Sequence, residues 1–144
     1  MTHDKSTNSE AWTHRSATHR EDACLAGTWG AELFELRPGP GEPIVVKHRY
    51  SPFVGTNIEH LLRATGRRSL LVTGVATNVC VEAVLRDGFA RDYHVVLIAD
   101  CAAAYTAEAH RTTVENVRSF LGRVVDSGHV RAHWQDSTRA VPDS

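Results

Sequence analysis

Short apolar runs alternate with amphipathic segments from residue 43 onward, and this alternation limits what the chain can fold into. The runs are rich in β-branched residues and are typical of strands, at 43–50, 69–74 and 94–100, with 123–127 as a final edge strand. Helical patterns follow the first three runs, at 55–66, 78–92 and 106–122. The alternation predicts an α/β fold with a parallel sheet.

The first of these helices carries signals at both ends. Thr56 with Glu59 three residues later is a capping-box pattern, and Gly66 is typical of a residue that ends a helix. Before residue 43 the character changes, because LRPGPGEP contains three prolines and two glycines and marks a loop. We expect a polar, irregular segment at 1–22, a globular domain at 23–126 and a C-terminal tail at 127–144.

Composition excludes several classes of function. The 144 residues suffice for one domain, and a formal net charge of -1 favours neither nucleic acid nor an anionic membrane as a partner. No apolar run approaches the roughly 20 residues that span a bilayer, and no signal-peptide core is present at the N-terminus. Three cysteines without CxxC spacing favour free thiols and a cytoplasmic location.

Cys80 lies a few residues after the strand at 70–73, where the next helix is predicted to begin. Free N–H groups and the positive end of the helix dipole favour a thiolate at such a position. The alternative is that Cys80 is a small buried apolar residue, as most lone cysteines are. Lys47, at the end of IVVK, would stabilise that thiolate or protonate a leaving nitrogen if it lay beside it; otherwise it extends into solvent.

The segment GVATNVCVEAVLRDGFARDYHVVLIADCAAA resembles the signature of the isochorismatase-like cysteine hydrolases. GTWGAEL, VVKHRYSPFVGT and LLRATGRRSLLVTG resemble the segments that precede it in that family, so the likeness covers about residues 24–125. The most similar members are the amidohydrolases of ureido and carbamoyl compounds. The resemblance implies a doubly wound, mostly parallel Rossmann-like sheet with helices on both faces.

The resemblance also implies how the site works. The family's nucleophile falls on Cys80 and its lysine on Lys47, and a cis peptide bond at Val75–Ala76 would direct the N–H groups of Ala76 and Cys80 into an oxyanion hole. The implied reaction cleaves a C–N bond of an amide, ureido or carbamoyl small molecule through a thioester on the cysteine. The implied substrate-binding residues are Trp29, Arg49, Tyr50, Phe53 and Asn78.

Each of those substrate-binding assignments has a structural alternative. The aromatic side chains are equally typical of core packing, and Arg49 of a surface ion pair. The chemistry needs no cofactor and no metal, and His3, His14 and His19 have no ligand-like spacing. The remaining histidines that we considered are expected to have surface or packing roles: His48, His60, His94 and His110.

The family's catalytic aspartate ends its first strand, and nothing in this sequence resembles that strand. Asp100, at the end of HVVLIAD, is expected to be structural. We therefore expect a chain that lacks the family's first strands, is weakly stable alone and is inactive on ureido substrates. The alternatives are a non-catalytic remnant or scaffold and a hydrolase of isochorismate-type ethers. Family members are commonly homo-oligomers, and we expect the same here.

Overall fold

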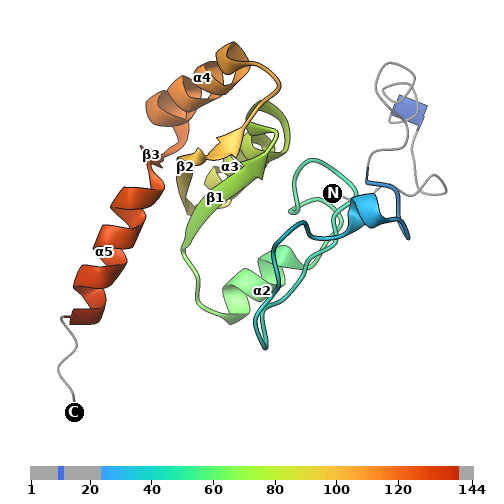
Figure 1. Ribbon diagram of the computed structural model, residues 1–144, viewed down its shortest axis with the longest axis horizontal. Coiled ribbons are helices and arrows are strands. Elements are labelled where there is room, and N and C mark those ends of the chain that lie inside the picture. The colour runs from blue at the N-terminus through green and yellow to red at the C-terminus, as the bar shows by residue number, and fades with distance from the viewer. Residues whose placement is uncertain (1–9, 12–23, 140–144) are drawn as a thin grey trace. The chain divides into compact units, whose positions relative to one another are not determined.

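The computed structural model describes residues 10–11 and 24–139 and divides the chain into two compact units, 1–58 and 59–144 (Figure 1). Each unit is described by itself below. The predicted irregular segment at 1–22 lies outside the described residues except for residues 10 and 11.

The second unit is built on a three-stranded parallel sheet with the strand order β1-β2-β3 (Figure 1). The strands are β1 (Ser69–Val75), β2 (His94–Ala103) and β3 (Arg123–Val125). A π-helical turn η3 (Thr77–Val81) and helix α3 (Glu82–Phe89) join β1 to β2. Helix α4 (Ala107–Asn116) and a second π-helical turn η4 (Val117–Leu121) join β2 to β3. This arrangement confirms the predicted α/β fold and its parallel sheet.

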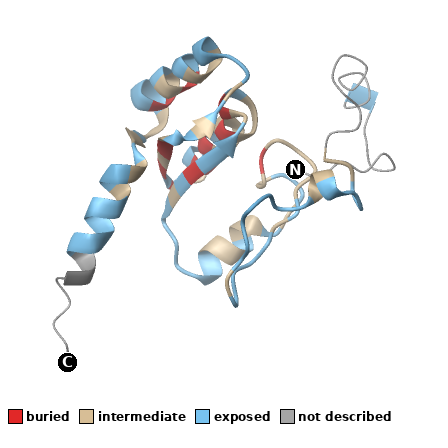
Figure 2. Cartoon of the chain, in the orientation of Figure 1, coloured by how far each residue is buried: buried red, intermediate tan, exposed pale blue. Residues whose placement is uncertain are grey.

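The core of this unit lies where α3 packs on β1 and β2. Leu85 of α3 and Leu97 of β2 have no exposed surface, and neither has Val117 at the start of η4. Figure 2 shows the buried segments of the chain in red. Burying one such side chain contributes about 1.5–3 kcal/mol to stability. The other buried apolar residues are Val72, Val81, Tyr93, Val95 and Ile98. The core thus holds the β1–η3–α3 connection against the centre of the sheet.

Strand β2 leaves the register of β1 near its carboxyl end. Val72 pairs with Leu97 and Gly74 pairs with Ala102, so β2 advances five residues (97 to 102) while β1 advances two (72 to 74). Asp100 lies within this irregularity and binds the start of helix α5 (Ser127–Arg139). Its carboxylate accepts hydrogen bonds from the Ser127 N–H at 2.8 Å and the Ser127 hydroxyl at 2.6 Å. These two bonds hold the pKa of Asp100 below its ordinary value of 3.8, and the bond from the Ser127 hydroxyl has the larger effect.

Asp100 therefore has the structural role expected from the sequence. The sequence predicts only a tail at 127–144, whereas the structure forms helix α5 there. A capping signal was present: Asp126 accepts a hydrogen bond from the His129 N–H at 2.7 Å, as an N-cap residue does for the third residue of a helix.

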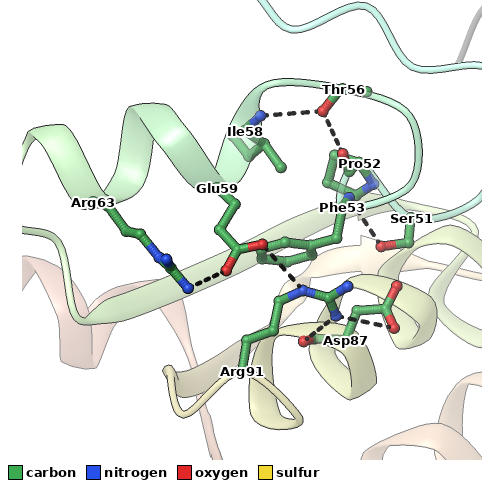
Figure 3. A network of polar contacts seen from close by, with 9 residues as sticks. All are labelled: Ser51, Pro52, Phe53, Thr56, Ile58, Glu59, Arg63, Asp87 and Arg91. Carbon is green, nitrogen blue, oxygen red and sulfur yellow. Dashed lines mark hydrogen bonds and ion pairs between the residues drawn. The ribbon is translucent and has the colours of Figure 1, made fainter.

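Helix α2 (Ile58–Ala64) begins and ends close to the predicted positions. The Thr56 hydroxyl accepts from the Ile58 N–H at 3.2 Å (Figure 3). Gly66 has φ +63°, its N–H binds the Arg63 carbonyl, and the next N–H binds the Leu62 carbonyl, which is a Schellman ending. The sequence thus predicted the glycine ending and the approximate start, but the Thr56–Glu59 capping box does not form, because the Glu59 carboxylate pairs with arginines instead.

The carboxylate of Glu59 forms ion pairs with two arginines (Figure 3). Arg63 lies one turn along α2 at 2.6 Å, and Arg91, just after α3, lies at 3.5 Å. Arg91 also contacts the Asp87 carboxylate at 3.5 Å. Glu59 and Asp87 are thereby linked through one guanidinium, so the start of α2 is connected to the end of α3.

The prediction of a strand at residues 43–50 is wrong. Residues 42–47 have no regular secondary structure, and residues 48–50 form a bend. A β-branched run becomes a strand only when its backbone groups pair with another strand. The described residues of the first unit, 10–11 and 24–58, contain no strand to pair with, and residues 24–57 contain a short 3-10 turn, η2 (Trp29–Ala31).

Candidate active site

Cys80 lies in the π-helical turn η3, directly between the carboxyl end of β1 and helix α3. The sequence predicted the first turn of an ordinary helix at this position; the structure has a wider turn, and α3 begins at Glu82. The turn opens at Ala76, whose carbonyl accepts hydrogen bonds from the Val79 N–H at 3.0 Å and the Val81 N–H at 3.2 Å. Such π turns are rare in proteins, and those that occur are often found at functional sites.

Three of the predicted site residues come together in this turn. Ala76 and the Cys80 thiol are half-buried, and Asn78 is exposed. The peptide bond between Val75 and Ala76 is cis. Gly74, at the end of β1, has φ +111° and open space where a side chain would lie, so this position requires glycine for its backbone conformation. A thiol at the carboxyl edge of a parallel sheet is in the region where ligands of open α/β sheets bind.

The remaining predicted residues lie in the first unit. The Lys47 ammonium donates hydrogen bonds to the carbonyl oxygens of Arg49 at 3.2 Å and Tyr50 at 2.5 Å. The Arg49 guanidinium donates to the His48 carbonyl at 2.9 Å. Lys47 therefore folds its own segment back on itself, with the lysine, the arginine and the tyrosine half-buried. The side chain of Phe53 is also half-buried, three residues beyond Tyr50.

Trp29 lies on η2 with 83% of its surface exposed, so it does not belong to a core. The approach of Lys47, or of any other residue of the first unit, to Cys80 stays a prediction. Within the second unit the structure brings together Ala76, Asn78 and Cys80.

Sequence reasoning missed the side chains that hold the turn in place. The buried hydroxyl of Thr77 is hydrogen-bonded to Nδ1 of His110 at 3.0 Å, and the Thr113 hydroxyl donates to the Glu82 carboxylate at 2.7 Å. For His110 the sequence predicts only a surface or packing role. No local signal identifies these pairs, because their members are 33 and 31 residues apart.

Neither a metal site nor a membrane span is found in the described part of the chain. Among those residues, no three side chains of His, Cys, Asp or Glu are grouped to hold a metal ion. Likewise, none of the described helices has the length and apolar character required to cross a bilayer.

The structure is an α/β domain with a thiol-bearing turn at the carboxyl edge of its parallel sheet, and comparison with known proteins identifies its family. The model of the isochorismatase domain matches residues 1–128, and the chain belongs to the isochorismatase family. Ureidoacrylate amidohydrolase RutB from Acinetobacter baylyi is 44% identical over 103 residues, covering 70% of this chain and 42% of that protein. RutB from Methylorubrum extorquens is 40% identical over 119 residues, covering 81% of this chain and 48% of that protein.

A solved structure supports the same assignment. An isochorismatase-like hydrolase from Alkaliphilus metalliredigens matches with a TM-score of 0.78 at 29% identity, covering 92% of this chain and 69% of that chain. The family resemblance and the α/β fold expected from the sequence are thereby confirmed. The chain spans less than half the length of the two RutB proteins.

Proposed function

We propose that this chain carries the nucleophile of an isochorismatase-family hydrolase that cleaves a C–N bond of an amide, ureido or carbamoyl small molecule. The observation that carries the proposal is the position of the Cys80 thiol, half-buried in a π-helical turn at the carboxyl end of β1. The relatives named ureidoacrylate amidohydrolase favour the ureido class of substrate.

In the proposed reaction the Cys80 sulfur attacks the carbonyl carbon, so that an S–C bond forms as the C=O becomes an oxyanion. The N–H groups of Ala76 and Cys80 are proposed to stabilise that oxyanion. The C–N bond then breaks, the leaving nitrogen takes up a proton, and a thioester remains on the sulfur. Water hydrolyses the thioester and regenerates the thiol.

The other proposed roles follow from the family resemblance. Lys47 would protonate the leaving nitrogen or stabilise the thiolate. The reaction also needs a base, which is an aspartate in the family; we assign no residue of the printed sequence to it. The proposed substrate contacts are Trp29, Arg49, Tyr50, Phe53 and Asn78. Among these, the exposed position of Asn78 in the same turn as the thiol supports its assignment most directly.

The proposed setting is the cytoplasm, with the protein acting on a small molecule as a homo-oligomer. The three free cysteines of the described chain support a reducing compartment. Sedimentation of the purified chain measures the oligomeric state, and a concentration-independent monomer would contradict the oligomer.

The nucleophile is tested by trapping its covalent adduct, because adduct formation depends on the thiol and does not require turnover. The three cysteines fall on separate tryptic peptides, spanning residues 21–47, 69–86 and 92–111. The chain is mixed with a reactive carbamoyl ester, whose leaving group departs without needing a proton. The reaction is quenched in acid, and the tryptic peptides are weighed. We expect the carbamoyl adduct on 69–86, and we expect its loss in Cys80→Ala.

Cys101→Ala is the matched control, because Cys101 is a more exposed thiol at the end of β2. This variant is expected to label at Cys80 as the unmodified chain does. Equal labelling of the three cysteine peptides, or labelling that persists in Cys80→Ala, would show that Cys80 has no special reactivity and would refute the proposal.

A further inference from the structure

The turn that carries Cys80 is attached at both ends to one face of helix α4. At its start, the Thr77 hydroxyl is hydrogen-bonded to Nδ1 of His110 at 3.0 Å. Just beyond its end, the Glu82 carboxylate accepts the Thr113 hydroxyl at 2.7 Å. His110 and Thr113 are three residues apart on α4, a spacing that places two side chains on the same helical face. Cys80 thus lies between two attachments to a single rigid element.

The two attachments differ in whether the polar group on the turn keeps a hydrogen-bond partner when its link to α4 is removed. Thr77 has no exposed surface, so without the imidazole its hydroxyl would be left in the interior without water. Glu82 also accepts hydrogen bonds from the Arg86 guanidinium, at 2.9 Å from Nε and 2.5 Å from the terminal nitrogen. Its carboxylate therefore keeps a partner if the Thr113 hydroxyl is lost. The start of the turn depends on its link to α4 more strongly than the end does.

Holding this turn matters because local preference does not determine its geometry. Val79 and Val81 are β-branched residues, which favour extended backbone over helical turns, and the π-helical pattern is intrinsically rare. In enzymes, a displacement of about 1 Å in a reacting group can lower the rate about 100-fold. A fixed contact from α4 to the first residue of the turn is a direct way to hold the thiol in place.

We propose that His110 is a positioning residue for Cys80, which acts through its hydrogen bond to Thr77 and does not itself contact substrate. The inference rests on the proposed role of Cys80 as the nucleophile. It assigns the histidine a role in the geometry of the thiol, beyond its packing against the turn.

The experiment compares the alkylation rate of Cys80 in variants of the full chain, measured peptide by peptide across pH with Cys101 as the reference thiol in the same sample. His110→Leu and Thr77→Val remove the hydrogen bond from either side. Each is expected to lower the Cys80-to-Cys101 rate ratio near neutral pH by about tenfold, less than the about 100-fold loss that a 1 Å displacement of a reacting group can cause. The pH dependence of the rate is recorded for both thiols, and a change in that of Cys80 without one in that of Cys101 is the readout of positioning.

Two further variants separate positioning from simple destabilisation. Asparagine places an amide atom as many bonds from the backbone as Nδ1, so His110→Asn is expected to retain the rate ratio within about threefold. Thr113→Val removes an equally buried hydroxyl from the same interface but leaves Glu82 paired with Arg86, and its pH profile should stay that of the unmodified chain. Circular dichroism identifies variants that have lost their fold.

The inference is overturned if His110→Leu folds and leaves the Cys80 profile unchanged, or if Thr113→Val alters that profile as much as His110→Leu does.

Failure of the proposed function is a separate result, in which Cys80 and Cys101 react alike in the unmodified chain. In that case the positioning role of His110 is tested by the rate of amide hydrogen exchange at residues 77–81. Faster exchange there in His110→Leu than in Thr113→Val supports the positioning role, and equal exchange refutes it. If His110→Leu does not fold, the same comparison is made with Thr77→Val, whose shape is nearly unchanged.

Discussion

Replacing Gly122 by alanine is expected to destabilise the second unit strongly, because the new methyl group would collide with the backbone of the central strand. A Cβ built on Gly122 lies 2.1 Å from the Val95 carbonyl oxygen and 2.8 Å from a methyl carbon of Val95. Backbone strain contributes nothing here, since φ is -175° and any residue adopts that value. The cost is therefore steric.

The size of the effect follows from how far the backbone must move. A carbon and an oxygen in contact stand a little over 3 Å apart, so Gly122 and Val95 must separate by about 1 Å. Gly122 directly precedes β3, whose first residue, Arg123, pairs with Val96 of β2. The separation would thus weaken the pairing of the edge strand. Overpacking typically costs about 1–3 kcal/mol, and we expect about 3 kcal/mol because the closest contact is with main chain.

The assay is urea unfolding of Gly122→Ala followed by far-ultraviolet circular dichroism. With a slope of about 1–3 kcal/mol per molar urea, a loss of about 3 kcal/mol lowers the midpoint by at least about 1 M. Gly66→Ala is the matched control. It has open space around its Cβ but φ +63°, and should cost about 1–2 kcal/mol through conformation alone.

Two results would refute this reasoning. One is a Gly122→Ala midpoint within error of the unmodified chain. The other is a rescue of the Gly122→Ala stability by Val95→Ala. It is measured as a double-mutant cycle, which compares the unfolding free energy of the double variant with those of the two single variants. Removing the Val95 side chain leaves the 2.1 Å contact with its carbonyl oxygen in place, so the coupling free energy should be small.

Three further predictions concern capping, the core and the ion pairs. Because the pKa of Asp100 is lowered in the folded chain, its bonds to Ser127 stabilise above about pH 4 and are lost as the pH falls through 3.8 toward the lower folded value. Asp100→Asn should therefore flatten the thermal stability profile between about pH 5 and pH 3, and an unchanged profile would contradict this. Leu85→Ala should cost about 2–5 kcal/mol in urea unfolding, against under about 1 kcal/mol for Leu71→Ala, whose side chain is 45% exposed; equal costs would place the core elsewhere. Glu59→Gln should cost under about 1 kcal/mol, since its ion pairs are partly exposed, and a larger loss would show that the pairs act as a network.

Much of the second unit could be predicted because its signals are local. The apolar run before Gly74 predicted β1, and the periodic residues before Phe89 predicted α3. Thr106 accepts a hydrogen bond from the Ala109 N–H at the start of α4, where the sequence placed a helix start. These features depend on side-chain period, caps and glycine conformations, all of which act within a few residues.

Sequence-based prediction of secondary structure was wrong or incomplete mainly where contacts with distant residues determine the local structure. The run IVVK has the composition of a strand, but the described residues of the first unit contain no strand with which it could pair, so its composition was insufficient. Helix α5 has a cap signal at Asp126, but the polar segment after it lacks a clear apolar period, so the sequence does not predict the helix. The wide turn at Cys80 was predicted as an ordinary helix start, since π turns are rare and an α-helical turn is the ordinary expectation after a strand.

By itself, then, the sequence determined the α/β alternation, the family and the residue that we propose as the nucleophile. Only the tertiary structure decided how that residue is held, because the Thr77–His110 and Glu82–Thr113 contacts join residues more than thirty positions apart. Such contacts form when strands and helices pack, and the packing depends on the whole core. A thiol is evident from a motif, whereas the hydrogen bonds that fix its turn exist only once α4 lies against η3.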